Sequence, residues 1–335
     1  MNKSTNYFEF IGIDISKLTI DVSIHSNKKA NVFENTNKGF KSMMAWTKKN
    51  ISCKEVEILF AMEHTGIYSL PISIFLSEKQ LNFILLPGLE IKRSLGIQRG
   101  KDDKIDAKRI AAYAYQKRDT IQPSTLPFDN ILKIRRLLTL RDKFVKQRAS
   151  YLKEQKENPR FLKRKENSVL FKSTDSTIDF LTKQIKTVEK ELDNIVKSDE
   201  LMYKQYCLII SIKGVGTQTA LFFIAYTNCF TSFDNWRKFA SYAGTAPFPY
   251  KSGTSIKGRT KVSNLANKKI KSLLNMCARS AITCNPELKL YFQTRKQKGE
   301  NGMSTLNIIR NKLISRIFAV VNRGTPYVDI CKFAG

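Results

Sequence analysis

The apolar and polar positions of the first third of the chain predict short strands followed by helices. Isoleucines alternate with Gly12 and Asp14 across residues 8–15, which is the period of two expected for a β-strand. A second strand is predicted at 19–24 after a tight turn, and residues 31–36 can supply a third. The chain is therefore expected to open with a β-hairpin that has room for one more strand.

Helices and apolar strands alternate in the segment that follows. A helix is predicted at 37–49, apolar strands at 55–62 and 81–87 with a helical stretch from about Ile67 between them, and a further helix at 102–118. Two strands joined by a helix are typical of a parallel pair with a crossover connection. We therefore expect a mixed α/β layer in this part of the chain.

The middle of the chain has a helical pattern. Residues 122–127 contain two prolines and small polar residues and are a plausible linker. From 128 to about 204 the sequence is charged, and the apolar positions between Ile178 and Val196 have heptad-like spacing. The polar section at 157–177 breaks this periodicity, which predicts a long helical hairpin or coiled coil. Its role can be spacing or oligomerisation, or it can present a face that tracks RNA or DNA.

The last third begins with an apolar stretch at 207–226 and continues through a loop rich in glycine and proline at 241–260. Helices are predicted at about 263–284 and 304–322. The stretch IKGVGTQTA at 212–220 indicates a tight turn between two helices. The backbone N–H groups at the start of the second helix can hold a DNA phosphate, although a simple packing turn explains the glycines equally well.

The charge balance indicates the class of partner. Lys and Arg number 58 against 29 Asp and Glu, a formal net charge of +29. Residues 206–335 hold 20 of the basic residues and 4 of the acids, a net charge of +16. Such a surface attracts polyanions, so nucleic acid is the expected partner. An anionic membrane surface is the competing partner, but no basic amphipathic segment lies beside an apolar span.

Cysteine and histidine usage argues against several other classes. The six cysteines form no CxxC pair, and His25 and His64 are the two histidines, which argues against a zinc site. Reduced, mostly buried thiols are typical of a cytosolic protein. The chain shows no apolar leader and no run of the ~18 apolar residues that a membrane span needs, so a cytoplasmic protein without a membrane partner is predicted.

Four acids fall where a metal site can form. Asp14 lies within the first strand, Glu63 ends the strand at 55–62, and Asp103 and Asp106 are three residues apart at a helix start. Each has an ordinary alternative, either an outward-facing acid on a half-exposed strand or charge that complements a helix dipole. Together they can converge in a ribonuclease-H-like layer. Carboxylates that converge repel unless divalent cations hold them, and Mg²⁺ or Mn²⁺ suits such a set in phosphoryl transfer.

A serine in the last third is a candidate nucleophile. Ser252 precedes Gly253 in the stretch PYKSGTSIKGRT, and seven basic residues and no acid occur from Lys251 to Lys271. A serine in such surroundings can attack a phosphodiester and form a phosphoserine link. Its alternatives are a turn residue or a hydrogen-bond donor to a phosphate. The basic residues expected to contact nucleic acid are Lys213, Lys251, Lys257, Arg259, Lys261, Lys268 and Lys269.

Taken in order, these motifs resemble those of the IS110 family of insertion-sequence transposases, which includes the Piv-type DNA invertases. The resemblance covers nearly the whole chain. It implies an α/β, RuvC-like catalytic domain of the RNase H fold at 1–122, a helical coiled-coil region at 123–205 and a mainly α transposase domain at 206–335. The matching stretches are GIDISK at 12–17, EHTGIY at 63–68, KDDKIDAKRIA at 101–111, IKGVGTQTA at 212–220 and YAGTAPFPYKSG at 242–253.

The resemblance also assigns roles to residues. Asp14, Glu63, Asp103 and Asp106 match the family's D-E-D-D set, which implies catalytic metal ligands for Mg²⁺ or Mn²⁺. Ser252 matches the family serine that stands just before a glycine, whereas Ser241 lies in a different stretch and does not match. Two positions depart from the family pattern. Asp102 adds an acid beside the site, and His64 replaces a small residue and can perturb the site or simply pack.

The activity implied is that of a DNA transposase or recombinase of an insertion sequence. Members of the family often work with a non-coding RNA of the element, so donor and target double-stranded DNA and a guide RNA are the expected partners. Strand exchange needs several active sites, so a homodimer or tetramer is expected in the prokaryotic cytosol, associated with the nucleoid. A Piv-like site-specific invertase, a metal-dependent junction nuclease without a serine intermediate, and a non-catalytic nucleic-acid-binding protein remain as alternatives.

Overall fold

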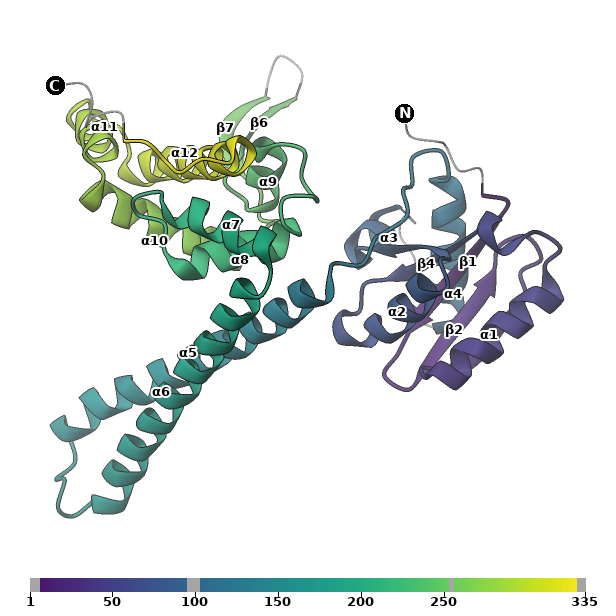
Figure 1. Ribbon diagram of the computed structural model, residues 1–335, viewed down its shortest axis with the longest axis horizontal. Helices are drawn as coiled ribbons and strands as arrows, with labels where there is room; N and C mark the ends of the chain where they lie inside the picture. The colour runs from purple at the N-terminus through teal and green to yellow at the C-terminus, as the bar shows by residue number, and fades with distance from the viewer. Residues whose placement is uncertain (1–6, 95–102, 253–255, 330–335) are drawn as a thin grey trace. The chain divides into compact units, whose positions relative to one another are not determined.

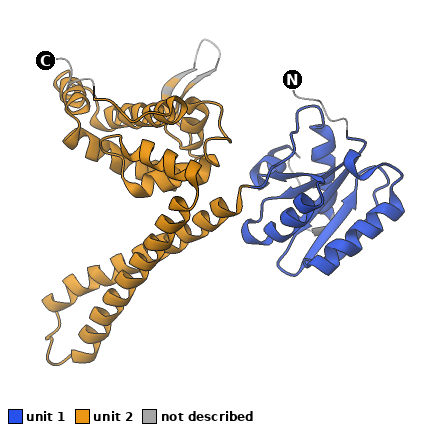
Figure 2. Cartoon of the chain, viewed as in Figure 1, with its two compact units in different colours: residues 1–126 blue, residues 127–335 orange. Residues whose placement is uncertain are grey.

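A computed structural model describes residues 7–94, 103–252 and 256–329 of the chain. It divides the chain into two compact units, residues 1–126 and 127–335, which are coloured separately in Figure 2. The acids of the predicted D-E-D-D set belong to unit 1, and Ser252 belongs to unit 2. In the described part of the chain, we find no helix with the length and apolar character needed to cross a membrane.

Unit 1 is built on a five-stranded mixed sheet with the order β3-β2-β1-β4-β5. β1 pairs antiparallel with β2 and parallel with β4; β2 also pairs antiparallel with β3, and β4 also pairs parallel with β5. The predicted mixed α/β arrangement of this region is confirmed. The strands are β1 (Glu9–Ile15), β2 (Thr19–Ile24), β3 (Ala30–Glu34), β4 (Ile58–Glu63) and β5 (Asn82–Leu86).

Helices cover both faces of this sheet (Figure 1). The isoleucines of β1 pack against α1 (Asn37–Asn50) and α2 (Leu70–Glu78) on one face. Phe10 on β1 and the alternate residues of β4 pack against α3 (Gly88–Ser94) and α4 (Asp103–Gln116) on the other. The period of two in the sequence thus separates two apolar cores, because successive side chains of a strand point to opposite faces.

Two elements of unit 1 begin three residues later than the sequence predicted. The strand expected at 55–62 begins at Ile58, because Glu55–Glu57 form a 3-10 turn in which the Glu57 carboxylate accepts from the Lys54 backbone N–H at 3.0 Å. The helix expected from about Ile67 begins at Leu70, after a second 3-10 turn at Gly66–Tyr68. Helix α3 was not predicted, since its seven residues carry no apolar stripe long enough to detect.

Unit 2 begins with a long antiparallel helical hairpin, α5 (Asp129–Glu157) and α6 (Ser168–Lys197) (Figure 1). The heptad-like positions Ile178, Leu181, Val188, Leu192, Ile195 and Val196 of α6 are buried, and Ile185 is half-buried. The polar section at 157–177 suggested that the second helix begins after it, but α6 begins at Ser168. The reason is that Phe171 and Thr174 are buried and extend the buried face of the helix by two turns toward its start. Between the helices, Asn158–Arg160 form a 3-10 turn.

The rest of unit 2 is a helical body with one small β-hairpin. Helix α8 is buried along most of its length, which makes it the centre of this body. The helical character expected for the C-terminal region is confirmed. The stretch at 241–260, expected to be a loop, instead contains two paired strands. The elements are α7 (Glu200–Ile210), α8 (Thr217–Thr227), α9 (Trp236–Tyr242), β6 (Pro247–Ser252), β7 (Ile256–Val262), α10 (Lys268–Cys284), α11 (Pro286–Gln297) and α12 (Gly302–Arg323).

Candidate active site

Asp14 and Glu63 lie at the same edge and on the same face of the sheet in unit 1. In the parallel pair of β1 and β4, Ile13 is the partner of Met62, so the next residues along the two strands are Asp14 and Glu63. Ile13 and Met62 belong to the core beneath the opposite face. Strand alternation therefore turns both carboxylates toward α3 and α4, at the carboxyl ends of the parallel strands where ligands of open α/β sheets gather.

Helix α4 brings its first turn to this edge. A Cβ atom added to Gly12 would lie 2.0 Å from the carbonyl oxygen of Ala107 and 2.4 Å from the backbone nitrogen of Ala111, so α4 rests directly on β1. At the other end of the helix, the ring of Tyr115 lies 5.6 Å from that of Phe10, near the start of β1. Helix α4 therefore runs opposite to β1, and its N-terminal turn lies toward the end of β1 that carries Asp14.

This first turn carries the other two predicted acids. Asp103 is the first residue of α4, one turn before Ala107, and its side chain lies outside the described residues, as does Asp102 altogether. Asp106 is described, and its carboxylate accepts from Arg109 at 2.7 Å in a partly exposed ion pair. Arg109 thus neutralises part of the charge that the acids bring to this edge, a role that the sequence reading did not assign.

Glu63 occupies a space that Gly88 leaves open. A Cβ atom on Gly88 would lie 1.9 Å from Oε1 of Glu63 and 2.6 Å from its Cδ. Gly88 begins α3, directly after β5, whose Leu86 is the neighbour of Glu63 in the sheet. The glycine therefore sets where the Glu63 carboxylate lies. The sequence held a signal for it, since glycine is the usual residue where another group must approach the backbone closely.

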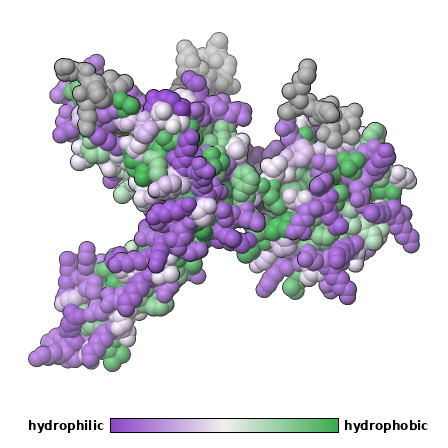
Figure 3. Space-filling view, viewed as in Figure 1, coloured by the Kyte–Doolittle hydropathy of each residue, from purple (hydrophilic) through white to green (hydrophobic). Residues whose placement is uncertain are grey.

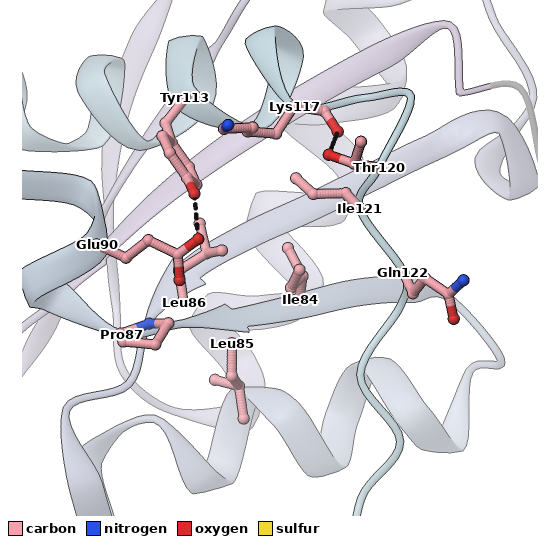
Figure 4. Close-up of a pocket in the computed structure, with 10 residues that line it drawn as sticks. All are labelled: Ile84, Leu85, Leu86, Pro87, Glu90, Tyr113, Lys117, Thr120, Ile121 and Gln122. Atoms are coloured by element: carbon pink, nitrogen blue, oxygen red, sulfur yellow. Dashed lines mark hydrogen bonds between the residues drawn. The ribbon is translucent and has the colours of Figure 1, made fainter. Parts of the chain in front are cut away.

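A hydrogen bond ties together the two helices on this face. The hydroxyl of Tyr113 on α4 donates to Oε1 of Glu90 on α3 at 2.5 Å (Figure 4). Burial of the phenol and this bond raise the pKa of Tyr113 to about 12. The pair lines a cavity of about 310 Å³ beside β5. Asp14, Glu63 and Asp106, the three predicted acids whose side chains are described, do not line this cavity.

The acidic edge has the donor chemistry of a divalent-metal site. Asp and Glu supply hard oxygen ligands, and the absence of a side chain on Gly88 leaves room for the Glu63 carboxylate. Among the described residues, which exclude the Asp103 side chain, no three His, Cys, Asp or Glu side chains form a group that could hold a metal ion. The structure thus shows the backbone elements of the D-E-D-D set converging, and the described side chains alone do not form a preassembled ligand cage.

His64 does not pack into the core. Its side chain is exposed, and its Nδ1 accepts from the backbone N–H of Gly66 at 3.3 Å. The residue therefore supports the turn after β4.

Ser252 is the last residue of β6 and pairs with Ile256 across the β6–β7 hairpin of unit 2. Its side chain lies outside the described residues. The start of the hairpin is held by Thr245, whose hydroxyl donates to Oδ1 of Asn311 at 2.9 Å. Asn307 and Asn311 both donate to the Thr245 carbonyl, at 2.9 and 3.0 Å. Helix α12 therefore fixes the chain a few residues before the candidate nucleophile.

The basic residues expected to contact nucleic acid differ in their surroundings. Lys213 pairs with Asp329 at 2.6 Å, and Lys269 pairs with Asp142 of α5, so both are engaged in ion pairs within unit 2. Lys261 and Lys268 are exposed. The side chains of the other three, Lys251, Lys257 and Arg259, lie outside the described residues.

The turn between α7 and α8 contains Gly214 and Gly216. Gly214 has a φ of +92°, and a Cβ there would lie 2.7 Å from Ala281 of α10, so packing explains this glycine. Gly216 is exposed, has nothing within 4 Å of the position of a Cβ, and caps α8 without a side-chain hydrogen bond. The first glycine is thus structural, and the second leaves the start of α8 open.

Comparison with known proteins identifies the family. Residues 11–158 match the DEDD-type transposase model of IS110 elements, and residues 206–293 match the model of the IS116/IS110/IS902 transposase family. The chain belongs to the IS110 family of transposases. It is therefore a DNA-acting enzyme. The first match contains all four predicted acids, and the second contains Ser252 and the turn at Gly214 and Gly216.

Relatives of this IS110 transposase include two proteins that match over nearly their full length. The chain is 26% identical to a pilin gene-inverting protein of Moraxella bovis over 95% of its own length and 97% of the relative. A pilin gene-inverting protein of Moraxella lacunata gives the same identity and coverage. An insertion element IS110 protein of Streptomyces coelicolor is also 26% identical, over 48% of this chain and 38% of the relative.

Proposed function

We propose that this transposase cuts and rejoins DNA with a two-part active site, a metal-dependent acidic site in unit 1 and a serine nucleophile in unit 2. The observation that carries the first part is the convergence of the β1 end, the β4 end and the α4 start at one edge of the sheet. Three antiparallel strands followed by two parallel ones, with the acids at this edge, support an RNase H-like, RuvC-like catalytic domain.

In this proposal Asp14, Glu63, Asp103 and Asp106 hold Mg²⁺ or Mn²⁺. A bound pair of such ions would stabilise the charge on the attacking and leaving oxygens of a phosphoryl transfer. The carboxylate of Glu63 occupies the space that a side chain at Gly88 would fill. Arg109 orients Asp106 through their ion pair. Asp102 stands next to the set in sequence and is a candidate for an additional ligand.

Ser252 is the proposed nucleophile. Its hydroxyl oxygen attacks the phosphorus of the scissile phosphodiester, a bond from serine to phosphorus forms, and the bond to the leaving deoxyribose oxygen breaks. The serine proton leaves with solvent or a neighbouring base, and the leaving oxygen takes up a proton. A hydroxyl of the new partner strand then reverses this step and releases the serine. The covalent link conserves the bond energy, so rejoining needs no added energy source.

The basic surface of unit 2 supports binding of double-stranded donor and target DNA. The hairpin of β6 and β7, called the serine hairpin because it carries Ser252, contains the exposed Lys261, and the exposed Lys268 begins α10 a few residues later. Gly216 leaves the start of α8 open to a backbone phosphate. In the view of Figure 3, hydrophilic residues dominate the visible surface of the α5–α6 hairpin. We propose that this region serves a guide RNA or the assembly of a dimer or tetramer, with the acids and the serine contributed by different protomers.

Site-specific inversion is the second candidate activity. The two relatives matched over nearly their full length are named pilin gene-inverting proteins, which favours a Piv-like invertase. Inversion and transposition use the same cutting and joining chemistry. They differ in whether the recombining sites lie on one DNA molecule in inverted orientation, which an assay with plasmids of either arrangement distinguishes.

Replacement of Ser252 tests the serine step. The Ser252→Ala variant should form no covalent protein–DNA adduct on a suicide substrate, while the Ser241→Ala control should form it at the wild-type level. Adducts that persist in Ser252→Ala would refute the assignment of the nucleophile. Strand cutting without any adduct in the wild-type protein would instead favour a metal-dependent nuclease that uses water.

A further inference from the structure

A buried arginine of α12 has only neutral hydrogen-bond partners among the described residues. Arg310 is 6% exposed, and its guanidinium donates to Oδ1 of Asn275 at 2.6 Å and to Oδ1 of Asn307 at 3.4 Å. Its Nε atom is buried and makes no hydrogen bond within the described part of the chain. Amide oxygens satisfy N–H groups but do not cancel a positive charge, and a buried charge is costly unless it is paired.

The acids of this region are engaged with other cations. Residues 206–335 contain four acids, and each is paired with a different basic residue: Asp234 with Lys238, Glu287 with Arg316, Glu300 with Arg295, and Asp329 with Lys213. The stretches of this region that the structure does not describe, 253–255 and 330–335, contain neither aspartate nor glutamate. The acidic side chains of this region therefore do not supply the negative charge that Arg310 needs.

Arg316 on the same helix shows the contrast. Its Nη2 atom donates to both carboxylate oxygens of Glu287, at 2.7 and 2.6 Å. A partly buried arginine that ties two helices together is thus matched by an acid from α11. Arg310 is more deeply buried, and its partners on α10 and α12 are amides.

Further cations lie along the seam between α10 and α12, which pack side by side (Figure 1). Lys271, Asn275 and Arg279 are spaced four residues apart and share one face of α10. Burial and the charge of Arg279 lower the pKa of Arg310, so the two guanidinium groups are close enough to repel. The Arg279 side chain is exposed, and within the described residues it makes no hydrogen bond or ion pair. An anion that reaches Arg279 from solvent would relieve this repulsion.

This seam adjoins the start of the serine hairpin. Asn307, which accepts from Arg310, donates to the carbonyl of Thr245 at 2.9 Å, just before β6 begins at Pro247. On the α10 side, Cδ of Lys271 lies 3.7 Å from the position that a Cβ atom would take on Gly244. The cations of both helices are therefore grouped around the point where the chain enters the hairpin that carries Ser252.

We propose that Arg279 and Arg310 bind one phosphate of the DNA strand that lies against the serine hairpin. This inference rests on the function proposed above, and neither residue belongs to the basic set expected from the sequence. A phosphate supplies the negative charge that the seam lacks, and its oxygens match the paired N–H groups of a guanidinium. A phosphate held at the start of the hairpin would fix the strand on which Ser252 acts.

The salt dependence of DNA binding by the full-length protein tests the proposal. Each phosphate that a protein neutralises contributes about 0.9 to the slope of log K against log salt concentration. Fluorescence anisotropy with a short labelled duplex measures this slope between about 50 and 200 mM KCl. We expect Arg279→Gln, Arg310→Gln and the double variant each to lower the slope by about 0.9, because the two residues share one phosphate. Two separate contacts would lower the slope of the double variant twice as far and contradict the proposal.

Arg323→Gln is the matched control. Arg323 is exposed at the last turn of α12, about 20 Å beyond Arg310 along the helix axis. Its replacement removes the same charge from the same helix and should leave the slope unchanged. An equal fall in this variant would overturn the inference, because the loss of any positive charge would then suffice.

Two further measurements separate this inference from the proposed function. Adduct formation on a suicide substrate shows whether the serine chemistry stands, whatever the slopes are. If the wild type forms the adduct and Arg279→Gln and Arg310→Gln keep the wild-type slope, the seam binds no DNA phosphate and the inference is wrong. A fall in slope with an RNA duplex and none with DNA would also contradict it.

Arg279→Gln carries the test if circular dichroism shows that Arg310→Gln does not fold, since the exposed Arg279 can be replaced without disturbing the core. Arg310→Lys then takes the place of Arg310→Gln. It keeps the charge but loses the paired N–H groups, so it should weaken DNA binding at an unchanged slope. Wild-type affinity in Arg310→Lys would contradict the role of the guanidinium.

Discussion

The acidic edge of unit 1 and the serine hairpin of unit 2 place their candidate catalytic groups in different ways. Asp14 and Glu63 are carried by strands with apolar cores on both faces, and α4 rests on β1 without an intervening side chain at Gly12. Ser252 instead ends a strand of a two-stranded hairpin, whose attachment to α12 is made at Thr245. The acids are therefore positioned by packing, and the serine is positioned by a few hydrogen bonds several residues away.

This difference indicates a division of labour. A metal site needs several oxygens in a fixed geometry, which a buried sheet supplies. In the proposed mechanism Ser252 holds one DNA end covalently and then passes it to a second strand, so its surroundings must accept both strands. Substitutions should therefore act on the acidic site through the packing of α4 and Gly88, and on Ser252 through the hydrogen bonds at Thr245.

The largest effect is expected for Gly12→Ala. The new methyl group would meet the Ala107 carbonyl oxygen and the Ala111 nitrogen, which are backbone atoms and cannot rotate away. Overpacking of this kind costs about 1–3 kcal/mol or more, and here it also displaces the helix that carries Asp103 and Asp106. Denaturant unfolding should show a less stable unit 1. Gly302→Ala, where the nearest atom is 3.8 Å away, should leave stability unchanged or higher.

A smaller but more specific effect is expected for Gly88→Ala. The methyl group would meet the end of the Glu63 side chain, which can rotate away, so the fold should survive. Displacement of the carboxylate by about 1 Å should lower the rate of strand cutting on the order of 100-fold. The rate of strand cutting at saturating DNA checks this result, and the melting temperature of the same variant shows whether it is folded. If Gly88→Ala cuts DNA at the wild-type rate, Glu63 does not act from its observed position.

Asn311→Ala should affect unit 2 and leave the acidic edge of unit 1 unchanged. It removes the hydrogen bonds that Asn311 makes to the hydroxyl and the carbonyl of Thr245, which should cost about 1–3 kcal/mol in unit 2. Covalent adduct formation should slow, whereas Mn²⁺ binding should keep its wild-type affinity because the acids lie in unit 1. Loss of Mn²⁺ binding in this variant would contradict the separation of the two parts.

The smallest effect is expected for Tyr113→Phe. Loss of the bond to Glu90 should cost about 1 kcal/mol. The pKa of Tyr113 is about 12 in the folded protein against about 10 when unfolded, so the stability it contributes below pH 10 is lost between pH 10 and 12. The unfolding free energy of the wild type should therefore fall more steeply over this range than that of Tyr113→Phe. Parallel slopes would show that the phenol is not held in its protonated form.

The sequence predicted much of unit 1 because its signals are local. Alternating isoleucines mark β1, and Glu63 follows an apolar strand, so parallel pairing alone predicts that it lies near Asp14. The sequence did not show the hairpin of β6 and β7, since prolines and glycines in that stretch resemble a loop. Nor did the sequence show that Asp14 and Asp21 are cross-strand neighbours. An aspartate in an alternating strand is interpreted as an outward-facing polar residue until the register of the strands is known.

The most direct test of the two-part site is to ask whether one covalent intermediate depends on both parts. The wild-type protein and Asp14→Asn are incubated with a suicide DNA substrate, with Mg²⁺ or with a chelator, and the modified peptide is identified by mass spectrometry. We predict a nucleotide adduct on Ser252 that forms with Mg²⁺ and is lost in Asp14→Asn and in the chelator. An adduct on another residue, or one on Ser252 that forms equally well without Asp14 and without metal, would contradict the account.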